Sequence, residues 1–297
     1  MKLLGSYQNG NYTVSIYDDG TKIRENDLDN LTPAFPESID LKICDRCDMG
    51  CAMCHEASTP DGKLGDIMNL RFIDSMHPYT EIAIGGGNPL EHPDLMPFLK
   101  KLKDKNILAS MTVNGRHFLK ELDQIKRLKT EGLIRGLGVS YSTNLSDVEK
   151  VNVVENLSDF PDSVLHVING MIDITDLKNI AKCQRVLVLG YKNLRRGETY
   201  LSSHEQQVQK NMKMLAAGLK SLMITIPVLA FDNLALTQLN VRKIVGEDTW
   251  NNLYMGGDGQ YTMYVDGVKE EFAISSTSKT RYKITDNLTD MFNVIRR

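Results

Sequence analysis

A regular alternation of short apolar strands and helix-like stretches fills the middle of this chain and restricts its fold more than any other feature. Strand signals recur at intervals that leave room for one helix between each pair. The predicted strands cover residues 39–43, 81–84, 107–113, 134–140, 164–168, 185–189 and 222–228. The predicted helices cover residues 67–77, 93–104, 118–130, 147–156, 174–182 and 203–217. Strands that alternate with helices of this length form βαβ units, so the pattern predicts an α/β protein with a parallel sheet.

Either a TIM-like barrel or a doubly wound sheet accommodates this pattern. With 297 residues the chain is short for eight full units once its ends are set aside, which favours a partial (β/α)6-type TIM-like barrel. We expect residues 39–232 to form this core. Residues 1–38 are predicted to form an N-terminal β unit. Residues 233–297 are predicted to contain a helix and a C-terminal β-hairpin, with strands at 260–265 and 271–276. Both ends are candidates for substrate selection.

Charge and hydropathy exclude some classes of protein. Lys and Arg number 35 against 38 Asp and Glu, a net charge of -3, which argues against a protein that coats DNA or an anionic membrane. No apolar run approaches the roughly 20 residues that span a bilayer. The first ten residues carry no signal-peptide core, so we expect a cytoplasmic protein.

The cysteines indicate a metal or cluster site. Four of the five lie close together, at Cys44, Cys47, Cys51 and Cys54, whereas Cys183 is remote and is predicted to be a core residue. An odd number and tight clustering disfavour a disulfide framework and favour iron or zinc. The cluster follows the first strand of the repeat, at the end of the sheet where ligands bind. Three thiolates on one [4Fe–4S] cluster would leave one iron open.

Two motifs in register carry a family resemblance. Cys47-x-x-x-Cys51-x-x-Cys54 follows the first predicted core strand, and Gly85-Gly86-Gly87-Asn88-Pro89 follows the second. A weaker third match, Thr112-Val113-Asn114-Gly115, ends the third strand. Over residues 39–228 the chain resembles the radical S-adenosylmethionine (radical SAM) superfamily.

The resemblance implies a function and a set of ligands. The chain would be an oxidoreductase-type enzyme whose [4Fe–4S] cluster cleaves S-adenosylmethionine (SAM) reductively to a 5′-deoxyadenosyl radical, which abstracts hydrogen from a substrate. An external one-electron reductant such as flavodoxin or ferredoxin would supply the electron. The implied cluster ligands are Cys47, Cys51 and Cys54. The implied SAM-binding residues are Met53, Gly86, Gly87, Asn88, Asn114 and Ser140, with Ser142 as the alternative to Ser140. The substrate would be a peptide or protein, or a nucleotide or base.

The chain departs from the family pattern at two positions. Met53 stands where the family usually has an aromatic residue, and Asn88 where it often has Glu, which predicts weaker SAM binding. A side chain at Gly87 is expected to exclude SAM while sparing the iron. The alternative function is a non-catalytic electron carrier or a zinc-binding interaction module that uses Cys44 as a fourth ligand. We predict instead that Cys44 is a strand-end thiol.

Other polar residues have two readings each. His55 and Glu56 either face the active site or start a helix in a polar loop. His166 and Asn169 either touch the adenosyl group or lie in the core, and His166 is predicted to be a hydrogen-bonded core residue. The basic residues Lys192, Arg195 and Arg196 are predicted to lie in a solvated loop, although an anionic substrate or the SAM carboxylate would also suit them. Asp232 and Asn233 are predicted to be helix caps.

Overall fold

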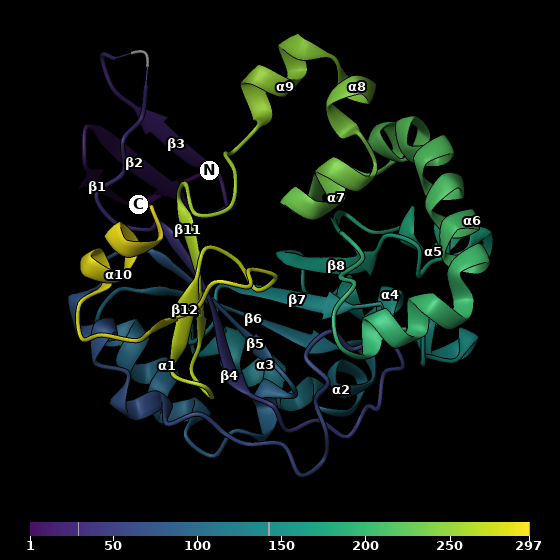
Figure 1. Ribbon diagram of the computed structural model, residues 1–297, viewed down its shortest axis with the longest axis horizontal. Helices are drawn as coiled ribbons and strands as arrows, with labels where there is room; N and C mark the ends of the chain where they lie inside the picture. Colours follow the sequence, from purple (N-terminus) through teal and green to yellow (C-terminus); the bar gives the residue numbers. More distant parts are fainter. Residues whose placement is uncertain (29, 142, 297) are drawn as a thin grey trace.

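The computed structural model describes residues 1–28, 30–141 and 143–296, and most of them surround one large sheet (Figure 1). Its strands are β4 (Ser38–Cys44), β5 (Glu81–Gly86), β6 (Leu108–Asn114), β7 (Gly136–Ser140), β8 (Ser163–Ile168), β9 (Arg185–Leu189), β10 (Val228–Phe231), β11 (Thr262–Asp266), β12 (Glu271–Ala273) and β13 (Tyr282–Lys283). Among the described residues these ten strands run in the order β10-β9-β8-β7-β6-β5-β4-β11-β12-β13. Pairing is parallel from β10 to β11. Among the described residues, β10 at one end of the sheet does not pair with β13 at the other end, so the sheet is not closed. The predicted partial TIM-like barrel is therefore confirmed.

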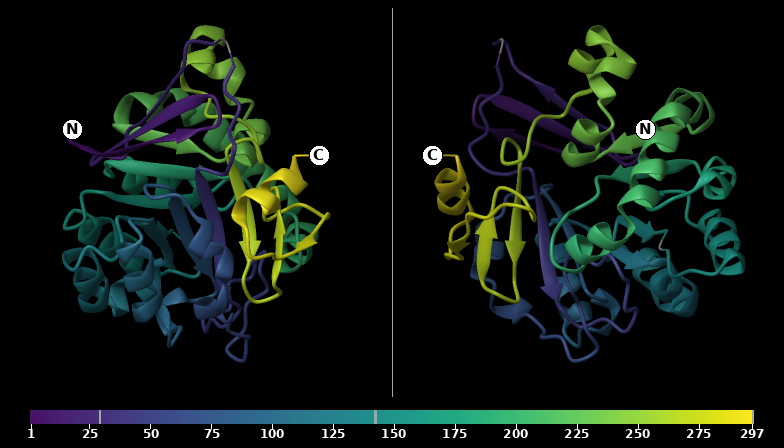
Figure 2. Two further views of the ribbon diagram at one scale, coloured as in Figure 1. Left: turned by 90° about the vertical axis from the view of Figure 1, so that its left-hand side faces the viewer. Right: turned by 45° about the vertical axis from the view of Figure 1, so that its right-hand side comes forward.

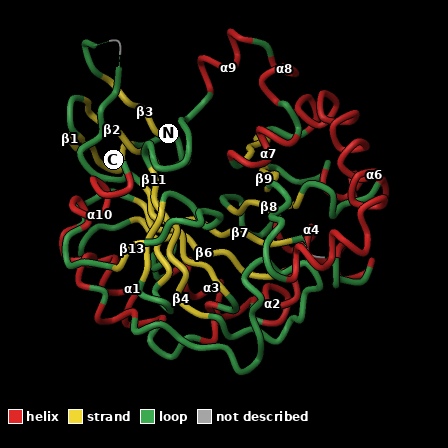
Figure 3. The backbone as a smooth tube through the Cα atoms, viewed as in Figure 1, coloured by secondary structure: helices red, strands yellow, loops and turns green. Residues whose placement is uncertain are grey.

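Helices cover the outside of the curved sheet, as Figure 3 shows. They are α1 (Leu95–Asp104), α2 (Gly115–Lys120), α3 (Leu122–Thr130), α4 (Asp147–Leu157), α5 (Ile174–Ile180), α6 (Arg196–Thr225), α7 (Asn233–Gln238), α8 (Val241–Val245), α9 (Glu247–Leu253) and α10 (Leu288–Ile295). Three short 3-10 turns are η1 (Ile67–Asn69), η2 (Arg71–Ser75) and η3 (Pro89–Glu91). None of the described helices combines the length and apolar character needed to cross a bilayer.

The two faces of the sheet have different compositions. Leu41, Ile84 and Val139 belong to the outward row, which is buried in the core beneath the helices. Alternate residues form the inner face of the barrel, where polar or small side chains such as Asp40, Gly85 and Ser110 are half-buried or exposed. The period of two in burial therefore separates a structural face from a face that ligands can reach.

Two sequence predictions were wrong. The strand predicted at residues 222–228 begins only at Val228, because α6 continues to Thr225. Leu215, Leu219 and Leu222 repeat at helical spacing and pack into the core, which outweighs the β-branched residues that follow them. Residues 67–77 form η1 and η2 rather than one helix.

The N-terminal β unit is confirmed as a separate antiparallel sheet of β1 (Leu3–Asn9), β2 (Tyr12–Tyr17) and β3 (Lys22–Glu25). Arg185, at the start of β9, donates from Nη1 to the Asp19 carbonyl oxygen at 3.1 Å. Arg135, just before β7, donates to the Tyr17 carbonyl oxygen. Figures 1 and 2 show this sheet at the opposite end of the barrel from the loop that follows β4. It closes the end where the strands begin.

Candidate active site

Backbone hydrogen bonds join the loops that follow β4 and β5. The Gly87 N–H donates to the Cys44 carbonyl oxygen at 2.8 Å, and the Asn88 N–H donates to the Arg46 carbonyl oxygen at 2.7 Å. A Cβ atom on Gly87 would lie 2.1 Å from the Arg46 carbonyl oxygen. The glycine therefore permits this close approach of two backbones. A side chain at Gly87 would therefore displace the backbone of the cysteine loop, so we now expect it to lower iron binding as well as SAM binding.

The loop between β4 and η1 holds three partly exposed cysteines, Cys47, Cys51 and Cys54. The Cys54 N–H donates to the Cys51 carbonyl oxygen at 3.2 Å, and the Cys47 N–H donates to the Thr59 carbonyl oxygen at 2.9 Å. Burial raises the pKa of the Cys47 thiol to about 11, and the neighbouring Cys51 and Cys54 add to the rise. The loop thus gathers three thiols whose thiolate forms repel one another until a cation offsets their charge.

The three loop thiols do not converge closely enough to share a single zinc ion as they lie. Sulfur atoms that share a zinc ion lie no more than about 4.6 Å apart, twice the Zn–S bond length. Among the described residues, the group of possible ligands that converges within 4.8 Å is Cys47, Asp48 and His117, without Cys51 or Cys54. The donor set of three partly exposed thiols fits the implied [4Fe–4S] cluster.

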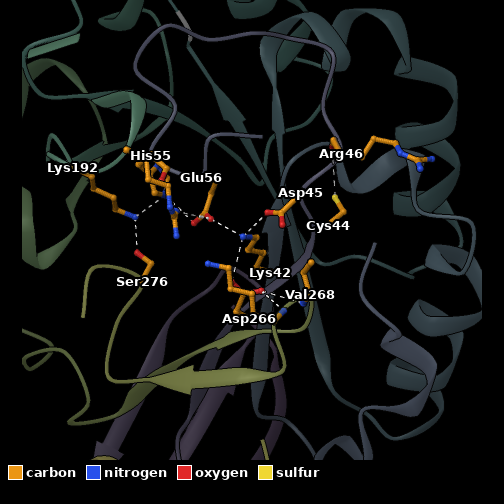
Figure 4. Close-up of polar contacts among 12 residues, drawn as sticks. Lys42, Cys44, Asp45, Arg46, His55, Glu56, Lys192, Asp266, Val268 and Ser276 are labelled. Atoms are coloured by element: carbon orange, nitrogen blue, oxygen red, sulfur yellow. Dashed lines mark hydrogen bonds and ion pairs between the residues drawn. The ribbon is translucent and has the colours of Figure 1, made fainter. Parts of the chain in front are cut away.

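Cys44 differs from the three loop cysteines. It is fully buried in the hydrophobic core beside Ile43, and its Sγ lies 3.9 Å from the Arg46 carbonyl oxygen. Figure 4 shows the thiol directed toward Arg46. Burial raises the pKa of Cys44 to about 12. The prediction of a strand-end thiol agrees with this position.

Side chains from later strand ends hold the cysteine loop. Asn114, at the end of β6, donates from Nδ2 to Cys51 Sγ at 3.8 Å. Asn144, after β7, accepts from Cys51 Sγ at 3.3 Å and donates to the Met49 carbonyl oxygen at 2.8 Å. His117 Nε2 lies 2.6 Å from Asp48 Oδ1. Sequence reasoning missed Asn144, Asp48 and His117, although Asn144 and His117 follow strands of the barrel closely.

The predicted SAM-binding residues lie around this loop, and they differ in how many of their polar groups already have partners. Gly86 and Gly87 adjoin Cys44 and Arg46. The Asn88 amide caps η3, because its Oδ1 accepts from the Leu90 N–H at 3.3 Å and its Nδ2 donates to Glu91 at 2.9 Å.

Three further residues belong to the predicted set. Asn114 and the half-buried Ser140 are register partners on β6 and β7. The Met53 side chain is buried with Met171, Tyr191 and Val208. Ser142 lies outside the described residues.

A buried ion network ties the cysteine loop to the sheet (Figure 4). The Lys42 ammonium, on the inner face of β4, lies 2.5 Å from Asp45, 2.8 Å from Glu56 and 3.3 Å from Asp266. Burial opposes the charge on Glu56, but His55 and Lys42 outweigh it and hold the pKa of this carboxyl well below its usual range. Burial lowers the pKa of His55, so Lys42 and Arg195 are the cations that oppose the charge of Glu56 near pH 7.

The basic residues after β9 also bind the cysteine loop, a contact that the prediction of a solvated loop did not include, although Arg195 is exposed. Arg195 donates to the His55 carbonyl oxygen at 2.5 Å and lies 3.2 Å from Glu56. Arg196 donates to the Ser58 carbonyl oxygen. Lys192 donates to Ser276 Oγ at 2.8 Å, on the segment after β12. His55 and Glu56 are therefore part of a network at the mouth of the barrel.

His166 is also placed differently from its prediction. It lies half-buried on the inner face of β8 and makes no hydrogen bond to any described residue through its side chain. A Cβ atom on Gly138 would lie 2.4 Å from its ring, so the imidazole lies over β7. Burial lowers the pKa of His166 to about 4, which keeps it neutral at pH 7. By contrast, the cap at Asp232 and the buried Cys183 are confirmed.

Comparison with known proteins shows the fold. No family model and no curated protein matches the chain. SuiB of Streptococcus suis, bound to precursor peptide SuiA, has a similar structure with a TM-score of 0.59 and 13% identity, over 88% of this chain and 65% of SuiB. SuiB bound to S-adenosylmethionine gives a TM-score of 0.57 at 13% identity, over 88% of this chain and 64% of SuiB. The chain thus spans about two thirds of SuiB.

Proposed function

We propose that this chain is a radical SAM enzyme that binds a [4Fe–4S] cluster through Cys47, Cys51 and Cys54. The observation that carries the proposal is the union of the cysteine loop with the glycine loop after β5, through the hydrogen bonds of Gly87 and Asn88. This arrangement joins the loop that carries the three thiols to the end of β5, where the Cβ position of Gly85 is open to a ligand. The fold shared with SuiB, which has been crystallised with SAM, supports the same function.

A [4Fe–4S] cluster held by Cys47, Cys51 and Cys54 would supply, when reduced, the electron for cleavage of SAM to methionine and a 5′-deoxyadenosyl radical, and that radical would remove hydrogen from the substrate. We propose that the electron comes from an external one-electron carrier such as flavodoxin or ferredoxin. The protein's own residues hold and enclose the site. Gly86 and Gly87 let the glycine loop pack against the cysteine loop, the open Cβ position of Gly85 gives SAM access to backbone, and Asn114 and Ser140 offer polar side chains near it. The Lys42 network keeps the loop closed against the sheet.

The position of Cys44 disfavours the electron-carrier and zinc-module alternatives. Both need a fourth thiolate, but Cys44 is fully buried in the core and its pKa is raised to about 12. Its participation would require the end of β4 to leave the sheet.

A peptide or protein is the substrate class that we favour over a nucleotide. SuiB, which has the same fold, was crystallised with a precursor peptide. The inner face of the barrel offers half-buried polar and apolar side chains to such a ligand.

The experiment is anaerobic reconstitution with iron and sulfide, reduction with dithionite and addition of SAM. We expect 5′-deoxyadenosine from the wild type and from Cys44→Ala, and none from Cys47→Ala. Absence of 5′-deoxyadenosine from a wild type that holds about four irons per chain would refute the proposal.

A further inference from the structure

One carboxylate lies on the inner face of the barrel without a hydrogen bond or ion pair to any described residue. Asp40, in the middle of β4, is exposed and makes no side-chain hydrogen bond or ion pair with any described residue. Its register neighbours are Ala83 on β5 and Tyr264 on β11. Because paired residues on neighbouring strands share a face, the three side chains line one stretch of the inner face. Ala83 is small and leaves room beside the carboxylate.

Tyr264 supplies a second polar group next to Asp40, and the Arg281 guanidinium lies over its ring, 5.1 Å from the ring centroid. The Tyr264 side chain is largely buried, yet its hydroxyl makes no hydrogen bond to any described residue. Burial raises the pKa of Tyr264 far above its usual value, so the phenol is neutral and both donates and accepts hydrogen bonds. A carboxylate and a hydroxyl thus present acceptors to the same space.

The charges that face Asp40 are mostly negative. Desolvation raises the pKa of Asp40, Lys192 opposes the rise, and Asp258 and Asp232 add to it. Asp232 caps α7, Asp258 accepts from Asn233, and Lys192 donates to Ser276. Of these three carboxylates, Asp40 is the one whose side chain makes no hydrogen bond or ion pair with any described residue, and Lys192, whose ammonium contacts His55 and Ser276, is the cation that faces it. An unsatisfied carboxylate in partly desolvated surroundings is unfavourable in the free protein, and it gains most from a cation.

We propose that Asp40, with Tyr264 beside it, binds a positively charged side chain of the substrate, an ammonium or guanidinium group. The proposal deepens the proposed function by naming a substrate feature, and it rests on that function. The charge of the bound group would fix which substrate residue lies in the barrel.

The test uses three probe peptides with the reconstituted full chain in the presence of SAM, under anaerobic conditions. The probes are acetyl-Gly-Lys-Gly-amide, acetyl-Gly-Arg-Gly-amide and the neutral acetyl-Gly-norleucine-Gly-amide, titrated by saturation-transfer NMR. We expect wild type to bind at least one basic peptide about tenfold more tightly than the norleucine peptide. Asp40→Asn should abolish this preference, and comparison of the two basic peptides distinguishes ammonium from guanidinium recognition.

The matched control is Asp104→Asn, which removes an equal charge from the exposed end of α1 and should leave the preference intact. Thermal unfolding at pH 8 provides a second readout. Because the ionised Asp40 is unfavourable in the folded chain, Asp40→Asn should match or raise the unfolding midpoint of wild type. A lowered midpoint would show a structural role and overturn the proposal.

Two binding results would also overturn it. The first is that wild type binds the basic and neutral peptides with equal affinity, or binds neither. The second is that Asp40→Asn keeps the wild-type preference for the basic peptides. Release of 5′-deoxyadenosine from the same samples is measured separately. An Asp40-dependent preference without 5′-deoxyadenosine would refute the proposed function and leave the cation site standing.

Discussion

At the scale of single residues, burial separates cysteines that the sequence places side by side. Cys44 and Cys47 are three positions apart, yet one is fully buried in the core and the other is partly exposed on the loop. A cluster ligand must be able to lose its proton and reach a shared centre. No strand has to move for the loop cysteines Cys47, Cys51 and Cys54 to reach a shared centre. Cys44 could reach it only by leaving the core.

The first prediction compares iron binding by two variants. Cys44→Ala should retain the iron and sulfide of wild type and lose about 1 kcal/mol of stability, because it leaves only a small cavity. Cys51→Ala should lose the cluster. The amounts of iron and acid-labile sulfide per chain are measured for both variants, and Cys183→Ala is the control. Equal loss of iron in Cys44→Ala and Cys51→Ala would support the alternative in which Cys44 is a fourth ligand of the metal site.

The second prediction separates SAM binding from loop integrity at two glycines. A Cβ atom on Gly85 meets nothing within 4 Å, whereas one on Gly87 meets the Arg46 backbone. Gly85→Val should therefore weaken SAM binding at least tenfold with unchanged iron content. Gly87→Ala should lower both. Equilibrium dialysis with labelled SAM measures the affinity, and iron analysis measures the cluster content. Full SAM affinity in Gly85→Val would show that SAM does not bind beside Gly85.

At the scale of elements, one lysine connects three parts of the chain. Lys42 of β4 holds Asp45 and Glu56 of the cysteine loop and Asp266 of β11. The C-terminal hairpin, which was predicted from its turn, thereby reaches the cysteine loop and stays a candidate for substrate selection. The N-terminal sheet lies at the other end of the barrel, away from the cysteines.

The third prediction removes the central cation of this network. Lys42→Met leaves buried carboxylates without their partner and should cost about 3–5 kcal/mol of the free energy of unfolding near pH 7. The pKa of Glu56 is lowered in the folded chain, so its contribution is present above about pH 4.3 and disappears as the pH falls through the folded pKa. The loss caused by Lys42→Met should therefore shrink in acid. Urea unfolding near pH 7 and in acid measures this loss of stability. The control is Lys279→Met, at an exposed position, which should have little effect at either pH.

At the scale of the whole molecule, the two ends of the barrel have separate tasks. The cysteine loop, the hairpin and the basic residues after β9 meet at one end, and the N-terminal sheet closes the other. The closing sheet is fastened by the buried Glu37, which lies 2.7 Å from Arg24 and accepts from the Tyr12 hydroxyl at 2.7 Å. Stability and chemistry should thus respond to different mutations.

The fourth prediction tests this separation. Burial opposes the charge on Glu37, but Arg24 and Lys22 outweigh it and lower its pKa. Glu37→Gln should lower stability by about 3 kcal/mol above pH 5, with a smaller effect as the pH falls below about 4. Release of 5′-deoxyadenosine per folded chain should stay at the wild-type level. The exposed Glu25→Gln is the control, and a selective loss of 5′-deoxyadenosine in Glu37→Gln would contradict the separation.

Local patterns made much of the fold predictable, and long-range contacts account for what was missed. The strands from β4 to β9 were predicted because each apolar run is short and bounded by turns or polar residues. The cysteine loop was predicted because its spacing is local. The ion pair of Lys42 with Asp266 joins positions 224 residues apart, which no local pattern reveals. The burial of Met53 with Tyr191 and the inward position of His166 likewise depend on how the barrel closes.

The most direct test of the central claim is the electron paramagnetic resonance spectrum of the reconstituted, dithionite-reduced protein with and without SAM. A cluster held by three cysteines has one iron open to exchangeable ligands, so SAM must change the spectrum. We predict this change in the wild type and equally in Cys44→Ala. A reduced cluster whose spectrum is the same with and without SAM would contradict the account, as would one zinc ion per chain in place of iron.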